Sequence, residues 1–397
     1  MTRAAFGATA VLAALASLPG AGAAQSLDVS GYALGVVTRA RAGDLGPGGT
    51  SWLGRGRLMA TWSLGPFSLE AAYEHLLERT PPGGGFAITT PGGTASSGAG
   101  DWLGVDWTVR KTSRTSWRQR FDRLALHFDA GPVEVVAGRQ AISWATTLYL
   151  TPADPFSPFD PSDPFREYRG GVDALRVRYS AGAFSELEAV VRPARTPFGT
   201  TLTALARGQT AVGSWSLGAW GGMLHDEAAG AVFATGAVGA NAVRGEVEVR
   251  KAPTGGATAR GAVGVDRRFS VAGRDLYGVA ELQVDGLGAA SADGLPAVLA
   301  SKPFARGEMQ VLGRTEAAIQ ASYQVHPLVE VDLMGLTDLS DGSLLVAPGA
   351  SWSATAAATV RLGLFKGFGH GTYDPLHPGS EYGSVPGIVY LSLSWFF

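Results

Sequence analysis

The chain has 397 residues, 56 glycines and no cysteine, and 17% of its residues are charged. The lack of cysteine excludes disulfides, thiolate metal sites, c-type haem attachment and cysteine nucleophiles. A formal net charge of -2 provides no general basic field, so we expect no nucleic-acid partner. The length fits either several soluble domains or one large closed sheet.

The first 24 residues have the pattern of an export signal. Arg3 provides the positive start, residues 4–18 are apolar, and a Pro-Gly step is followed by small residues. An apolar stretch of ~15 residues is short for a membrane span, which favours cleavage over a short membrane anchor. We therefore predict a cleaved signal peptide over 1–24 and a mature chain over 25–397 that leaves the cytoplasm.

The last nine residues, VYLSLSWFF, alternate strictly between two faces. One face is apolar and aromatic, and the other carries serine: Val389, Leu391, Leu393, Trp395 and Phe397 against Ser392 and Ser394. This pattern predicts a strand with one face toward lipid. It resembles the terminal strand by which the assembly machinery of Gram-negative outer-membrane barrels recognises its substrates, which implies that role for Trp395 and Phe397.

Alternation of this kind recurs along the chain and predicts about 18 strands, or 16 if one hairpin is lost. The expected strands are 27–41, 51–64, 66–79, 117–130, 132–145, 171–181, 184–194, 201–209, 212–225, 230–239, 241–252, 258–270, 273–286, 311–324, 327–339, 342–354, 357–367 and 385–397. A soluble sandwich or propeller would also alternate, but its wet faces carry more charge than these strands do.

Tight turns and longer connections follow each other in turn. Leu64-Gly65-Pro66 is one of the tight turns, whereas 80–116, 146–170, 287–310 and 368–384 are long connections. Short periplasmic turns and long outer loops are typical of transmembrane barrels. The sequence therefore predicts an all-β protein, one transmembrane antiparallel up-and-down β-barrel over 25–397, in contact with outer-membrane lipid in a Gram-negative bacterium.

The segment TPADPFSPFDPSDPF, residues 151–165, places proline at every third position. Polyproline II has three residues per turn, so the segment would be a stiff rod with an aromatic stripe and an acidic stripe. We expect it to narrow the mouth of the barrel, although a partner surface and a rigid surface loop remain alternatives. The residues assigned to this constriction loop are Asp154, Phe156, Phe159, Asp160, Asp163 and Phe165.

Residues 138–179 contain a longer motif. It begins with Gly138-Arg139-Gln140, continues through Trp144 and an Arg-Glu pair at 166–167, and ends with Gly171-Val172-Asp173-Ala174. This stretch resembles a segment of porin-like outer-membrane barrels of Gram-negative bacteria, some of which sheathe electron-carrying cytochromes. The resemblance supports a porin-like barrel and says little about its solute. Ala145 stands where that family usually has glycine.

Inward-facing positions carry charges in an uneven pattern. Arginines fall on early strands, namely Arg55, Arg57, Arg123, Arg176 and Arg178; carboxylates fall on late strands, namely Asp266, Glu281, Asp285, Glu316, Glu330 and Asp332. In a closed ring these two groups face each other across the lumen. We interpret them as a basic wall and an acidic wall that select polar solutes. Alternatively, the charges pair with each other, or they hold a partner protein.

No catalytic motif accompanies this pattern. The sequence has neither a Gly-x-Ser-x-Gly elbow nor a His-Glu-x-x-His motif, so we expect no enzyme and no cofactor. His370, Asp374, His377 and Glu381 share the last outer loop, but spacing that loose is more typical of solvated side chains than of a metal site. The predicted function is a passive channel for small polar solutes or ions. The alternative is a non-enzymatic barrel that sheathes a periplasmic partner such as a multihaem cytochrome.

Overall fold

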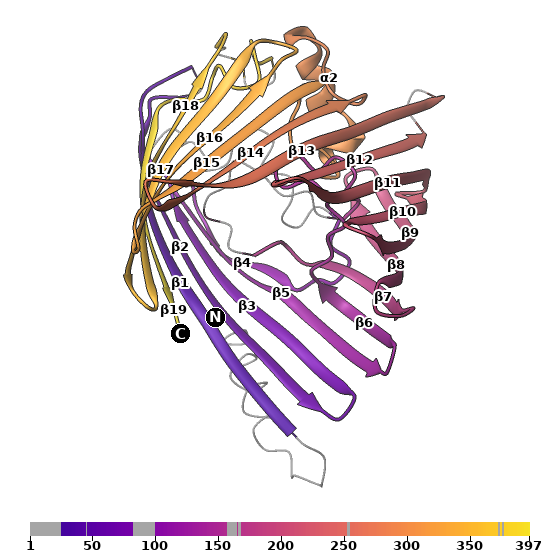
Figure 1. The fold of residues 1–397 in the computed structure, drawn as a ribbon. Helices are drawn as coiled ribbons and strands as arrows, with labels where there is room; N and C mark the ends of the chain where they lie inside the picture. The colour runs from indigo at the N-terminus through magenta and orange to yellow at the C-terminus, as the bar shows by residue number, and fades with distance from the viewer. Residues whose placement is uncertain are drawn as a thin grey trace.

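A single antiparallel sheet closes on itself in the computed structural model (Figure 1). The structure describes residues 25–44, 46–81, 100–156, 165, 168–251, 255–371, 374 and 377–397. The predicted signal peptide over 1–24 lies outside these residues, as do Phe159, Asp160 and Asp163 of the predicted constriction loop. None of the described helices is long and apolar enough to cross a membrane.

The strands are β1 (Gln25–Ala40), β2 (Gly49–Leu64), β3 (Phe67–Arg79), β4 (Asp106–Lys111), β5 (Thr115–Ala130), β6 (Val133–Gln140), β7 (Val172–Ser180), β8 (Ser185–Thr196), β9 (Gly199–Val212), β10 (Trp215–Leu224), β11 (Glu227–Val238), β12 (Asn241–Lys251), β13 (Ala257–Val271), β14 (Arg274–Asp285), β15 (Thr315–His326), β16 (Val329–Asp338), β17 (Ser343–Thr355), β18 (Ala358–Phe368) and β19 (Ile388–Phe396). A 3-10 turn, η1 (Ala292–Gly294), and two short helices, α2 (Leu295–Leu299) and α3 (Lys302–Ala305), lie between β14 and β15.

Closure joins the two ends of the chain. β1 pairs with β2 on one edge and with β19 on the other, where Tyr32 lies opposite Phe396. β3 pairs directly with β5, so the ring contains 18 strands and β4 is an additional short strand that pairs with β5 alone. The predicted up-and-down barrel of about 18 strands is therefore confirmed.

The two faces of the C-terminal strand have the predicted orientation. Leu391 and Trp395 on β19 are 51% and 52% exposed on the outside, whereas Ser392 and Ser394 are 5% and 8% exposed on the inside. Large apolar side chains are exposed in the same way on most strands, as Leu187 is on β8. A continuous apolar outer face is what the hydrocarbon core of an outer membrane requires.

Several strand ends differ from their predicted positions. β6 ends at Gln140, whereas the expected strand continues to 145. Ile142 and Trp144 lie beyond the end of the sheet and are buried inside the barrel. Their apolar side chains continued the alternating pattern, which is why the sequence predicted a longer strand. β15 begins at Thr315 instead of 311, because the apolar residues just before it are likewise buried inside the barrel without belonging to the sheet. β4 lies within the predicted loop 80–116.

The inner face is not uniformly polar. The connections after β6, β14 and β18 turn into the ring at one end, which we call the long-loop end. Their apolar side chains pack against apolar residues of the wall, as Leu150 does against Leu336 and Leu345. α2 and α3 belong to the connection after β14, where Leu295 and Leu312 pack in a cluster of their own.

Candidate functional site

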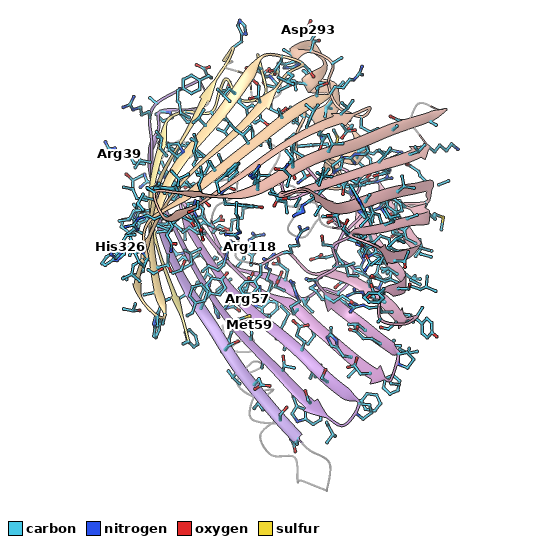
Figure 2. All side chains as sticks on the ribbon, in the orientation of Figure 1. Arg39, Arg57, Met59, Arg118, Asp293 and His326 are labelled. Atoms are coloured by element: carbon cyan, nitrogen blue, oxygen red, sulfur yellow. The ribbon has the colours of Figure 1, made fainter. Side chains whose placement is uncertain are left out.

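The inner faces of β2, β3 and β5 carry a buried set of ion pairs, which we call the arginine network. Arg57 Nη1 lies 2.6 Å from Glu74 Oε1 and 2.7 Å from Asp122 Oδ2. Arg57, which is labelled in Figure 2, is 3% exposed. Arg120 contacts Glu74 at 2.7 Å, and Arg123 contacts Asp122 at 2.6 Å. Each carboxylate therefore has two or more guanidinium partners, which offset the cost of removing its charge from water.

A β-bulge in β5 makes this network possible. Ala72 of β3 lies opposite Arg123 and Tyr73 lies opposite Phe121, so Asp122 has no counterpart on β3. The extra residue turns both Asp122 and Arg123 toward the lumen, where they are 3% and 5% exposed. Strict alternation would have placed these neighbours on opposite faces.

The porin-like motif forms a second pair across β6 and β7. Arg139 lies opposite Asp173 and donates from Nε and Nη2 to both carboxylate oxygens, each at 2.8 Å. Asp173 also accepts the backbone N–H groups of Trp102 and Leu103. The motif residues Arg139 and Asp173 therefore fasten the connection after β3 to the wall.

The glycines of the same motif permit close backbone contacts. A Cβ atom at Gly171 would lie 2.1 Å from the backbone oxygen of Asp122. Gly138 has a φ of +122°, and a Cβ there would lie 2.3 Å from the backbone oxygen of Leu124. Gln140 donates to the backbone oxygens of Val136 and Ala174. The Arg-Glu pair at 166–167 lies outside the described residues.

Carboxylates on the opposite side of the ring hold the connection after β6. Glu281 of β14 accepts the backbone N–H groups of Leu148, Tyr149 and Leu150 at 2.6–2.9 Å. Glu246 of β12 accepts those of residues 146 and 153 at 2.8 and 2.9 Å. We call Glu246 and Glu281 the loop anchors. Burial raises the pKa of the Tyr149 phenol to about 12, so that it stays neutral beside Glu281.

The described part of the predicted constriction loop lies against the inner wall. Asp154 accepts a hydrogen bond from Ser143 Oγ at 2.8 Å and forms an ion pair with Arg169 at 3.2 Å. Phe156 is 5% exposed and packs edge-on against Trp144, with ring centroids 4.8 Å apart. Phe165 is 3% exposed and packs in the same way against Tyr390 of β19.

The other predicted basic residues each have a partner. Arg55 donates to the backbone oxygen of Phe165 at 2.8 Å. Arg176 contacts Glu188 at 2.6 Å, and the half-exposed Arg178 contacts Glu134 at 3.0 Å. Ion pairs between neighbouring strands, which the sequence left open as an alternative, therefore occur on this side of the lumen.

The predicted acidic residues fall into four groups. Asp266 and Asp285 pair with Arg244 and Arg260 of adjacent strands at 2.9 Å, and Asp332 of β16 pairs at 2.8 Å with Arg361 of β18, across the intervening β17. Glu281 is a loop anchor, and Glu330 is exposed beside the turn after β15. Glu316 has no ion pair among the described residues and lies beside two other carboxylates, Asp338 and Glu381.

The last outer loop is arranged differently from its spacing in the sequence. His377 and Asp374 contact each other at 2.6 Å on the surface, whereas Glu381 turns into the barrel and is 5% exposed. Burial raises the pKa of Glu381 to about 7, the direction expected for a carboxyl without a positive partner.

Several residues of the lumen were not singled out from the sequence. Alternation along β3 would have placed Glu74 inward, but nothing in the sequence pairs it with Arg57. Glu246 was not among the predicted carboxylates, and its contacts depend on a loop about a hundred residues earlier in the chain. Asp122 was not predicted to face the lumen, because strict alternation along β5 does not allow for the bulge that turns it inward. These contacts depend on tertiary structure and leave little local signal.

Comparison with known proteins confirms the fold. No protein-family model matches the chain, and no curated protein matches its sequence. Acinetobacter baumannii OccAB1 is similar with a TM-score of 0.56 at 7% identity, over 94% of this chain and 96% of that chain. A BenF-like porin from Pseudomonas fluorescens Pf-5 has a TM-score of 0.54 at 10% identity, over 94% and 98% of the two chains.

A third solved structure is Pseudomonas aeruginosa OccK2 (OpdF) in complex with glucuronate, with a TM-score of 0.53 at 12% identity over 94% of this chain and 98% of that chain. At such low identities the likeness concerns architecture. The chain has the fold of Gram-negative outer-membrane porins, so the porin-like barrel that the sequence predicted is confirmed, and the fold fits the predicted outer-membrane location.

Proposed function

We propose that this chain forms a passive channel through the outer membrane for small polar solutes or ions. The observation that carries the proposal is the contrast between the two faces of the closed ring. The outer face is apolar, whereas the inner face carries arginines and carboxylates on many strands. Charges are tolerated inside a barrel when its lumen is wet.

Selectivity in this proposal depends on charges that line the path. Arg55 and Arg176 line the side of the early strands, and Asp266 and Asp332 line the side of the late strands. The segment 151–165 narrows the path at the long-loop end. One structural neighbour was solved with glucuronate, a small organic anion, so such anions are the first solutes to test. The channel is non-enzymatic and binds its solute weakly enough to release it.

The contacts inside the ring favour a channel over a sheath for a partner protein. The connection after β6 is held by Glu246 and Glu281 through backbone hydrogen bonds, and Trp144 and Phe156 are buried against the wall. A protein threaded through the lumen would have to displace these contacts. Small solutes would not.

Single-channel recording of the protein in planar bilayers tests the proposal. We expect discrete, stable open steps in simple salt. Arg55→Gln with Arg176→Gln should shift the reversal potential toward cation selectivity, because two positive charges leave the lumen. Arg39→Gln is the matched control: Arg39 lies opposite Val389 on the outer face, so its loss should leave selectivity unchanged (Figure 2).

Two results would contradict the proposal. A folded, inserted barrel that conducts no current would contradict the channel and favour the alternative in which a partner protein fills the lumen. Steps whose selectivity responds equally to the Arg39 control and to the lumen variants would show that the lumen arginines are not the selectivity elements.

A further inference from the structure

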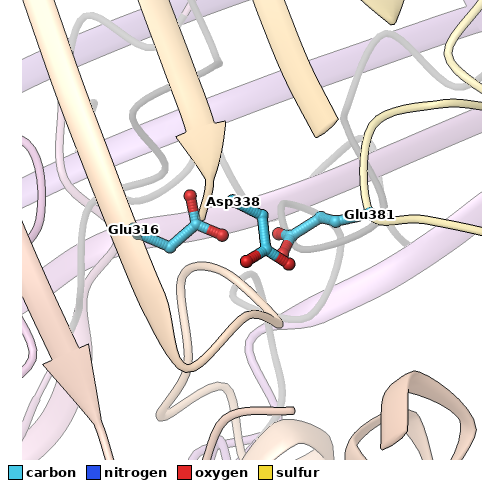
Figure 3. Close-up of side chains that lie close together, drawn as sticks. All are labelled: Glu316, Asp338 and Glu381. Atoms are coloured by element: carbon cyan, nitrogen blue, oxygen red, sulfur yellow. The ribbon is translucent and has the colours of Figure 1, made fainter. Parts of the chain in front are cut away.

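Three carboxylates from separate elements meet inside the long-loop end. Glu316 lies at the start of β15, Asp338 ends β16, and Glu381 belongs to the connection between β18 and β19. They are 0%, 1% and 5% exposed. One carboxylate oxygen of each lies within 4.8 Å of the others, and Figure 3 shows the three side chains directed toward one another.

These carboxylates differ from the other buried acids of the lumen. Asp285 has Arg260 at 2.9 Å, and Asp122 has Arg57 at 2.7 Å. Within the described parts of the chain, no basic side chain forms an ion pair with any of the three. A fourth carboxylate, Asp341, lies nearby and accepts the backbone N–H of Glu381 at 2.7 Å. Burying several like charges together without a cation is strongly unfavourable.

Two oxygens of the cluster have no hydrogen-bond partner although they are fully buried. They are Glu316 Oε1 and Asp338 Oδ2. The remaining oxygens are occupied: Glu381 accepts backbone N–H groups of residues 312 and 313, and Tyr382 donates to Glu316 Oε2 at 3.3 Å. Two unsatisfied acceptors on side chains directed into one space indicate that a positive ligand belongs between them.

The donor set is that of a hard cation. Calcium takes carboxylate and carbonyl oxygens at ~2.3–2.6 Å, so two of its ligands can be at most ~5 Å apart. The 4.8 Å limit on the oxygens of this cluster fits that span. Magnesium prefers shorter, strictly octahedral contacts and keeps several waters, and zinc prefers nitrogen and sulfur ligands.

We propose that Glu316, Asp338 and Glu381 bind a calcium ion that fastens the last outer loop to the barrel wall. The ion joins β15 and β16 to the connection after β18. Gly313 packs directly on Asp338, where a Cβ would lie 2.4 Å from the carboxylate carbon, and its N–H reaches Glu381. The connection after β14 is therefore held at the same point, and calcium stabilises the folded arrangement of two inward loops.

Terbium luminescence and thermal unfolding of the full barrel in detergent test the site. Tb³⁺ replaces Ca²⁺ in oxygen sites, and the phenol of Tyr382, 3.3 Å from Glu316, should sensitise its emission. We expect saturable emission that calcium displaces at lower concentration than magnesium does. Calcium should also raise the midpoint of thermal unfolding, and a chelator should reverse the rise.

Variants locate the ion. Glu316→Gln, Asp338→Asn and Glu381→Gln combined should abolish the saturable emission and the calcium-dependent rise. Asp285→Asn is the matched control, since it removes an equally buried carboxylate that has an arginine partner, and it should retain both effects. Tyr382→Phe should lose most of the emission and keep the thermal effect.

Other outcomes would overturn the site. Folded wild-type barrel that shows neither saturable emission nor a calcium effect would mean that the carboxyls share protons instead of a cation. Emission that persists in the combined variant, or that is undiminished in Tyr382→Phe, would place the ion elsewhere. If the combined variant does not fold, Glu381→Gln alone serves the same comparison, because Glu381 lies in a loop. None of these measurements depends on conduction through the barrel.

Discussion

The two sides of the lumen use buried carboxylates in different ways. On β2, β3 and β5, Glu74 and Asp122 are neutralised by guanidinium groups of the same wall. On β12 and β14, Glu246 and Glu281 meet backbone N–H groups of a loop that has crossed the lumen. The first arrangement stabilises the wall, whereas the second attaches a loop to it. The partner, and not the residue type, decides which role a carboxylate has.

The second arrangement requires a loop with donors to offer. Leu148, Tyr149 and Leu150 precede the first proline of the segment and supply three N–H groups to one carboxylate. Pro152 and Pro155 have no N–H, but their fixed φ lowers the entropy lost when this part of the loop is held in place. The proline repeat therefore starts just after the three N–H donors to Glu281. Within the repeat, Ala153 still donates its N–H to Glu246.

Removal of Arg57 should have the largest effect on stability. Arg57→Ala removes the guanidinium that Glu74 and Asp122 share, so less positive charge remains beside these two buried carboxylates. Breaking a buried ion pair costs about 3–5 kcal/mol. Urea unfolding of the barrel in detergent measures the loss. Adding Glu74→Gln to Arg57→Ala should recover part of it, since one of the two buried negative charges that had shared Arg57 is then gone. A free energy of unfolding within 1 kcal/mol (a value at the level of exposed pairs) of the wild type would refute the arginine network as a stabilising element.

Removal of a loop anchor should affect stability less and conduction more. Glu281→Ala leaves three backbone N–H groups without their acceptor, but the loop can move and hydrate them, so we expect a loss of about 2 kcal/mol. The freed segment should produce larger or noisier open steps in single-channel records. Glu330→Ala also removes an inward negative charge, but Glu330 is exposed and holds no loop, so its steps should stay quiet. Equal noise in both variants would show that charge, and not anchoring, controls the steps.

The sequence was sufficient for the barrel because the barrel depends on local alternation. Leu391 and Trp395 were predicted to face lipid from the two-residue period alone, and the structure places them there. The six residues of β4 were missed because a strand that pairs on one edge over so short a length has little periodicity to detect. Trp144 was assigned to a strand because burial against a wall and burial in a sheet select the same apolar residues.

The partners inside the lumen could not be predicted from the sequence to the same degree. Alternation assigns a side chain to a face, but it does not say which neighbour that side chain meets. Asp122 and Arg123 share a face only because of a bulge, which has no composition signal here. The carboxylates Glu316, Asp338 and Glu381 come from three separate elements, and only the inward fold of the last loop brings them together.

The smallest effect is expected for Arg178, and it isolates the contribution of burial. Arg178 contacts Glu134 at 3.0 Å, a distance similar to those in the arginine network, but the two side chains are 31% and 26% exposed. Because water screens the pair and both side chains lose entropy in forming it, Arg178→Ala should cost at most about 1 kcal/mol in the same urea unfolding. The conservative variant Arg178→Lys should be nearly neutral. If Arg178→Ala were as costly as Arg57→Ala, burial would not be what distinguishes the arginine network from other ion pairs of the lumen. The contrast between the two sides of the lumen would then have to be explained by strand position alone.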